Sequence, residues 1–126
     1  MGGHGAITLY LKHRDLFKSC SAFAPIANPI NCPWGKKAFT GYLGSDENEW
    51  KKHDATELIC QDAKIWIDQG TSDKFLKDEL KIENLEKRAK EVGADVKIHL
   101  REGYDHSYTF ITTFLKEHFD YHVISI

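Results

Sequence analysis

The sequence has no long hydrophobic run and no strong excess of charge of one sign. Its apolar segments are far shorter than the ~18 residues that a transmembrane helix needs, so we expect no membrane partner. Lysine and arginine together number 17, against 19 aspartates and glutamates, for a formal net charge of −2. This balance offers no basic surface to nucleic acid. A hydrophobic fraction of 41% and a charged fraction of 29% are typical of a globular domain.

Cysteine is also scarce. Cys20, Cys32 and Cys60 are odd in number and widely spaced, which argues against a disulfide framework and against paired zinc ligands. Three such thiols suit a reducing cytoplasm, where we expect the protein to be located. His118 and His122 lie four residues apart, but "HFDYH" lacks the glutamate of a metalloprotease helix. We therefore expect a packed or solvated histidine pair rather than a metal site.

The first half of the chain combines two regular elements with a long irregular segment. Apolar spacing predicts a helix over residues 6–17, and "KSCSAFAP" (18–25) predicts a short buried strand. All three prolines lie in "PIANPINCP", which excludes regular structure there. The rest of this excursion, which spans some forty residues in all, predicts only short helices. An irregular excursion of this length in a small domain is usually a lid or a pocket wall.

The second half of the chain alternates strands and helices. "AKIWIDQG" (63–70) and "VKIHL" (96–100) predict strands, and apolar spacing predicts helices over 76–92, ending at Gly93, and over 110–119. Alternation of this kind with short connections predicts an α/β fold with a parallel sheet of three strands.

Two polar residues follow neighbouring strands of the predicted sheet. Asp73 comes just after the strand 63–70, and His106 comes just after the strand 96–100. Since the carboxyl ends of parallel strands meet at one edge of a sheet, both side chains are expected at the same crevice. The order aspartate then histidine is the second half of a Ser…Asp…His triad. Solvated loop residues would give the same pattern, so both interpretations stay open at this point.

The opening "MGGHGA" suggests how the triad would begin. A nucleophile elbow reads G-x-S-x-G and turns sharply from a strand into a helix. With a serine directly before Met1, the stretch becomes S-M-G-G-H-G-A, and the glycines and the abrupt helix both have a reason.

Four segments taken together resemble one family. "MGGHGA", "SAFAPIANPINCPWGKKAFTGYLG", "IDQGTSDKFL" and "EGYDHSYTFI" are similar, in order and spacing, to segments of the S-formylglutathione hydrolase (esterase D) family of α/β-hydrolases. The likeness runs nearly end to end. It implies that residues 1–126 are the C-terminal portion of a single α/β-hydrolase domain, with three parallel strands, flanking helices and an irregular pocket wall.

The resemblance also implies roles for individual residues. The charge-relay acid of the family corresponds to Asp73 and its catalytic base to His106, whereas Asp68 and Asp105 are rival acids less well placed in the motif. Met1 takes the position directly after the nucleophile, and the backbone N–H of Met1 would donate into the oxyanion hole.

One aromatic residue of the excursion is a further site candidate. Trp34 either lines the acyl pocket or is a packing residue.

The implied reaction is hydrolysis of S-formylglutathione to formate and glutathione, as in formaldehyde detoxification, together with hydrolysis of small carboxylic esters. It needs no metal and no cofactor, and members of the family commonly form homodimers. Because the nucleophile would precede Met1, we expect this chain alone to be inactive, as a fragment or a truncated gene model. Its first strand would expose an edge to aggregation. The alternative is a non-catalytic fragment that acts by binding.

Overall fold

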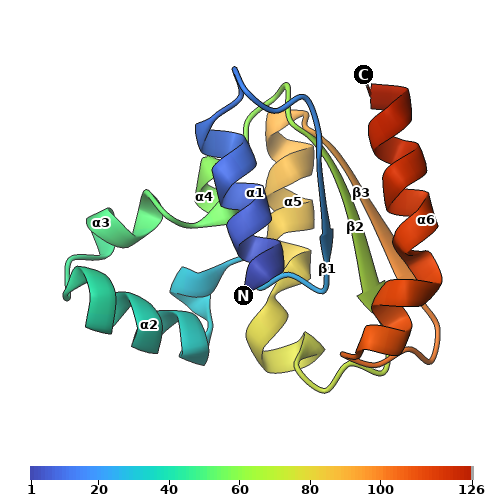
Figure 1. Ribbon diagram of the computed structural model, residues 1–126. Coiled ribbons are helices and arrows are strands. Elements are labelled where there is room, and N and C mark those ends of the chain that lie inside the picture. The colour runs from blue at the N-terminus through green and yellow to red at the C-terminus, as the bar shows by residue number, and fades with distance from the viewer. Residues whose placement is uncertain (126) are drawn as a thin grey trace.

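The computed structural model describes residues 1–125 as a parallel sheet with a layer of helices on each face. The strands β1 (Cys20–Phe23), β2 (Lys64–Gly70) and β3 (Asp95–Arg101) lie in the order β1-β2-β3. Ile67 of β2 is paired with Ala22 on one side and with Ile98 on the other. Figure 1 shows α1 (Gly2–Lys12) and α5 (Ile82–Val92) on one face of the sheet, and α6 (Tyr108–Ser125) on the other. The predicted α/β fold with three parallel strands is therefore confirmed.

The first helix lies earlier in the chain than the predicted 6–17. It begins at Gly2 and ends at Lys12, because His13 leaves the helical region of φ and ψ. A Cβ on Gly3 would lie 2.9 Å from the Cβ of Pro25, so only glycine lets the helix start this close to the chain leaving β1. Phe17, which had extended the apparent apolar pattern, is 46% exposed.

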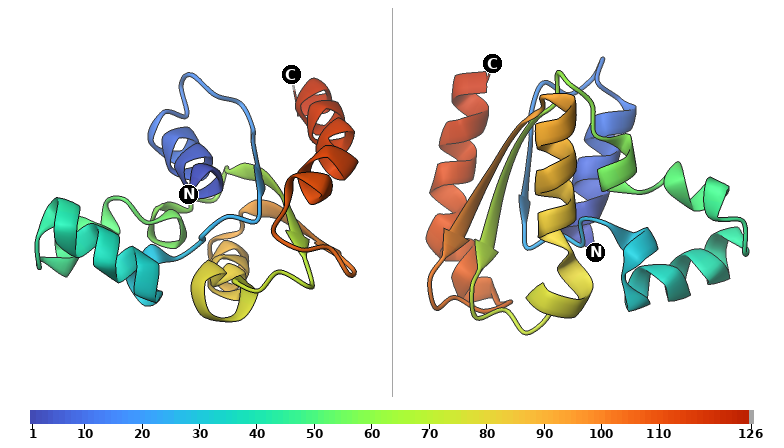
Figure 2. Two further views of the ribbon diagram at one scale, coloured as in Figure 1. Left: turned by 60° about the horizontal axis from the view of Figure 1, so that its bottom comes forward. Right: turned by 180° about the vertical axis from the view of Figure 1, so that it is seen from behind.

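The predicted irregular excursion with short helices is confirmed. The prediction that its proline cluster has no regular structure is wrong, because the short 3₁₀ helix η1 (Pro29–Asn31) and the helix α2 (Pro33–Leu43) each begin at a proline, which the first turn of a helix tolerates. The helices α3 (Glu47–Lys51) and α4 (Ala55–Leu58) follow. Figure 2 shows α2 and α3 standing away from the layered body. Buried Asp54 anchors the returning chain, because its carboxylate caps α4 and accepts hydrogen bonds from the side chain of Asn28 and the backbone of Ile30.

The predicted helix over 76–92 is two segments. A wide helical turn, η2 (Leu76–Leu80), is separated from α5 by Lys81, whose φ of 51° is left-handed. The change of direction lets Leu80 pack with Phe110 and Leu85 pack in the main core. The one continuous apolar pattern over residues 76–92 therefore belongs to two separate hydrophobic clusters.

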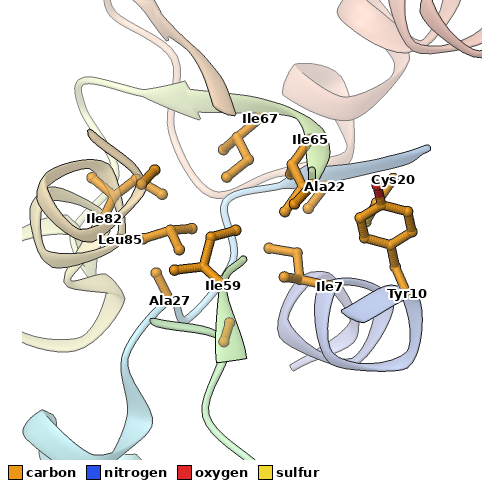
Figure 3. Close-up of a cluster of buried hydrophobic side chains, with 13 residues drawn as sticks. Ile7, Tyr10, Cys20, Ala22, Ala27, Ile59, Ile65, Ile67, Ile82 and Leu85 are labelled. Atoms are coloured by element: carbon orange, nitrogen blue, oxygen red, sulfur yellow. The ribbon is translucent and has the colours of Figure 1, made fainter. Parts of the chain in front are cut away.

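The main core fills the space between the sheet and the helices α1 and α5. Figure 3 shows Ile65 and Ile67 of β2 pointing toward Ile7 of α1 and Leu85 of α5. All four side chains are fully buried.

The last helix is longer than the predicted 110–119, and its apolar face is less buried than predicted, since Phe119 is 63% exposed. Among residues 1–125, no helix is both long and apolar enough to cross a membrane.

Candidate active site

The loops that leave β2 and β3 meet at the carboxyl edge of the sheet. The backbone N–H of Thr71 donates to the carbonyl of Arg101 (3.0 Å), and that of Ser72 donates to the carbonyl of Tyr104 (2.9 Å). Gly70 permits this approach, because a Cβ there would overlap the carbonyl oxygen of Tyr104. The second loop, residues 102–107, is therefore held against the first by backbone bonds.

This junction brings Asp73 and His106 together, as the sequence predicted. The Nδ1 of His106 lies 2.7 Å from Oδ2 of Asp73. The Asp73 side chain is fully buried, while that of His106 is 43% exposed. The same carboxylate accepts hydrogen bonds from the backbone N–H of Phe75 (2.8 Å) and from the side-chain amide of Gln69 (3.2 Å). A fixed acid thus orients one ring nitrogen of the histidine and leaves Nε2 as the group for proton transfer.

The rival acids lie elsewhere. Asp68 is buried in β2 and bonds to His118 and Arg101. Asp105 is an exposed loop residue whose backbone carbonyl accepts the N–H of Ser107.

An apolar hollow of about 210 Å³ adjoins the site and is lined in part by Met1, His4, Trp34 and Phe39. Trp34 is 46% exposed, and its ring lies 4.7 Å from that of Phe75. Trp34 is thus a lining residue as well as a packing residue. Met1 is the N-cap of α1, with an exposed side chain, and shares this hollow with Trp34.

Phe75 links the hollow to the pair Asp73 and His106. Its ring packs edge-on against that of His106, with centroids 5.3 Å apart. Buried Glu79 accepts the backbone N–H of Trp34 (3.0 Å) and so fixes the start of α2. Gln69, Phe75 and Glu79 were not predicted from the sequence. A polar residue inside an apolar strand is a signal, but Asp68 and Gln69 share it, and nothing comparable marks Phe75 or Glu79.

His4 lies at the inner wall of the hollow in its neutral form. Burial, followed by nearby positive charge including that of Lys12, lowers the pKa of His4 to about 4. Its Nε2 accepts the backbone N–H of Ala55 (3.2 Å), which an imidazolium could not do. Within residues 1–125, no cluster of three or more histidine, cysteine or acidic side chains is placed to hold a metal ion.

Known proteins are similar to this chain over nearly its whole length, both in sequence and in fold. The Esterase family model, whose description reads "Putative esterase", matches residues 1–121. S-formylglutathione hydrolases from Arabidopsis thaliana and Bos taurus are 52% and 49% identical over 97% of the chain. The match covers only 44% and 45% of those relatives, so the chain spans less than half of their length.

Solved structures agree. An S-formylglutathione hydrolase from Agrobacterium tumefaciens superposes with a TM-score of 0.90 at 41% identity, over 96% of this chain and 45% of that one. An S-formylglutathione hydrolase from Staphylococcus aureus, 19% identical, shares the fold with a TM-score of 0.73 over 98% of this chain and 51% of that one. On the family match over residues 1–121, the chain belongs to the esterase family.

Proposed function

We propose that this chain carries the acid and the base of an S-formylglutathione hydrolase, with Asp73 as the acid and His106 as the base. The observation that carries the proposal is the 2.7 Å contact between the buried Asp73 carboxylate and the half-exposed His106 ring. A buried acid that orients a histidine is the arrangement that activates a serine nucleophile.

In the proposed reaction, a serine directly before Met1 attacks the formyl thioester carbon. His106 takes the hydroxyl proton through Nε2 and returns it to the departing glutathione thiolate. Asp73 stabilises the imidazolium and holds the ring in the productive tautomer. Water, deprotonated by His106, then attacks the formyl ester; formate leaves and the serine regains its proton. The backbone N–H of Met1 is the proposed oxyanion donor in both steps. No step uses a metal or a cofactor.

The apolar hollow favours a second activity on small carboxylic esters. Its volume of about 210 Å³ and its walls of Trp34 and Phe39 exceed the needs of a formyl group. We assign Trp34 to this acyl pocket. Comparing kcat/KM for S-formylglutathione and for p-nitrophenyl acetate separates the two activities.

Further parts of the proposal concern the cell and the assembly. Three free cysteines, two of them buried, support a cytoplasmic location, and the reaction would serve formaldehyde catabolism. We also propose that the complete enzyme forms a homodimer, and that the 126-residue chain alone is inactive for lack of a nucleophile.

The test is a fusion enzyme. The segment of the Arabidopsis relative that precedes its matching region is joined to residues 1–126, and hydrolysis of S-formylglutathione is measured. We expect activity that falls at least about 10³-fold in His106→Ala and in Asp73→Asn. Asp105→Asn is the matched control, since Asp105 is an exposed acid adjacent to the base. Equal activity in Asp73→Asn and Asp105→Asn would overturn the assignment of the acid.

A further inference from the structure

A second aspartate–histidine pair lies inside the protein, on the face of the sheet opposite the main core. Oδ2 of Asp68 lies 2.7 Å from Nε2 of His118 and accepts Nε1 of Trp66 at 3.2 Å, while Oδ1 accepts Nε of Arg101. The Asp68 side chain is fully buried, and that of His118 is 4% exposed. The proposed reaction gives this cluster no role.

The cluster links the start of the loop that carries His106 to the helix that follows the loop. Arg101 is the last residue of β3, directly before the loop 102–107, and α6 begins directly after the loop at Tyr108. Arg101 stands directly before the loop, and His118 lies ten residues into α6; both bond to the one carboxylate of Asp68. The start of the loop and the helix that follows it are therefore tied to a single buried charge.

Other contacts reinforce this connection. Nη2 of Arg101 donates to Glu117 of α6 (2.8 Å), and its guanidinium lies 4.1 Å from the ring centroid of Phe114. The ring of Phe23 on β1 stacks on His118 at 3.8 Å with an interplanar angle of 14°. The carbonyl of Arg101 accepts the N–H of Thr71, in the loop that carries the proposed acid. Arg101 thus contacts the sheet, α6 and the acid loop together.

The charge of Asp68 is maintained by its partners. Burial alone would raise the pKa of Asp68, but the hydrogen bonds from His118 and Arg101 outweigh it and hold the pKa below its ordinary value. An amide in place of this carboxylate would turn an N–H₂ toward donors and leave the partly buried guanidinium of Arg101 with only the exposed Glu117 as its carboxylate partner. Breaking one side of a buried ion pair is strongly unfavourable, so the surrounding segments would shift.

We infer that Asp68, through Arg101 and His118, is a positioning residue that sets where His106 stands relative to Asp73 in the proposed triad. The inference rests on the proposed function. A purely structural role would hold α6 on the sheet and leave the geometry of His106 unchanged. Misplacement of a catalytic group by about 1 Å can reduce the rate by about 10²-fold, so the two roles differ measurably.

The experiment compares Asp68→Asn and Arg101→Lys with the control Asp120→Asn. Asp120 is an exposed carboxylate of α6 that pairs with Lys116, so its removal perturbs the same helix without touching the cluster. The first readout is the ¹⁵N chemical shifts of the His106 ring in the histidine-labelled fusion enzyme. The second is kcat and KM of the fusion enzyme, with thermal unfolding followed in parallel.

We expect Asp68→Asn to shift the His106 nitrogens toward a mixture of tautomers and to lower kcat by 10- to 100-fold, with KM changed less than threefold. Arg101→Lys, which keeps the charge, should give a smaller loss of kcat. A folded Asp68→Asn enzyme with unchanged kcat and unchanged His106 shifts overturns the inference. Asp73→Asn, measured alongside, separates the two proposals. If Asp73→Asn is silent the proposed function fails, whereas if only Asp68→Asn is silent this inference fails alone.

Discussion

Protonation of His4 should destabilise the folded chain, and His4→Gln should remove that effect. In the folded state, Nε2 of the partly buried His4 accepts the N–H of Ala55, so this nitrogen carries no proton. The amide oxygen of glutamine can take the place of Nε2 as an acceptor but does not titrate in this range. The substitution therefore keeps the hydrogen bond to Ala55 and deletes the pH dependence.

The size of this destabilisation follows from the shift in the pKa of His4. Burial lowers the pKa of His4 from 6.5 to about 4, so between these pH values His4 is protonated in the unfolded chain and neutral in the folded chain. The contribution of His4 to the free energy of unfolding is therefore fully present above about pH 6.5 and is lost as the pH falls toward 4. A pKa difference of this size corresponds to about 3 kcal/mol, of which about 2 kcal/mol is lost between pH 7.5 and pH 5.

Urea unfolding of the chain at pH 7.5 and at pH 5 measures this loss. Other groups also titrate in this interval, so the informative quantity is the difference between the wild type and His4→Gln at the two pH values. His13→Gln, which changes an exposed histidine at the end of α1, is the control and should behave as the wild type. If the wild type and His4→Gln lose equal free energy on acidification, the argument from burial of His4 is refuted.

Two further substitutions test the loop junction and the core. Gly70→Ala should lower the free energy of unfolding by about 1–3 kcal/mol and displace the loop of His106, because the new methyl group overlaps the carbonyl of Tyr104. Urea unfolding and the His106 ring shifts measure this, and an unperturbed His106 would contradict it. Leu85→Ala should cost about 2–5 kcal/mol in unfolding free energy, because the fully buried Leu85 packs between α5 and the sheet. A loss of unfolding free energy below 1 kcal/mol would show that the core around Leu85 is not tightly packed.

The choice between the acids illustrates what a sequence can predict. Asp73 and His106 were placed together because parallel strands end at one edge, and this rule needs only the positions of the strands. Asp68 looked like a rival because it is a neighbouring acid, five residues before Asp73 and within the strand that leads to it. The alternation of side chains along β2 turns Asp68 toward α6, where a second histidine, His118, binds it. That partner lies 50 residues away and has no counterpart in local sequence.

Local chemistry in the sequence determined the order of helices and strands, the irregular excursion marked by its prolines, and the pairing of Asp73 with His106. These features follow from periodicity, backbone restrictions and the shared edge of a parallel sheet. Only the tertiary structure decided that Phe75 packs on His106, that Glu79 holds the start of α2, and that Asp68 links Arg101, before the loop 102–107, to His118 of α6. Such contacts depend on the distances between segments far apart in the chain, and packing of the whole core sets those distances.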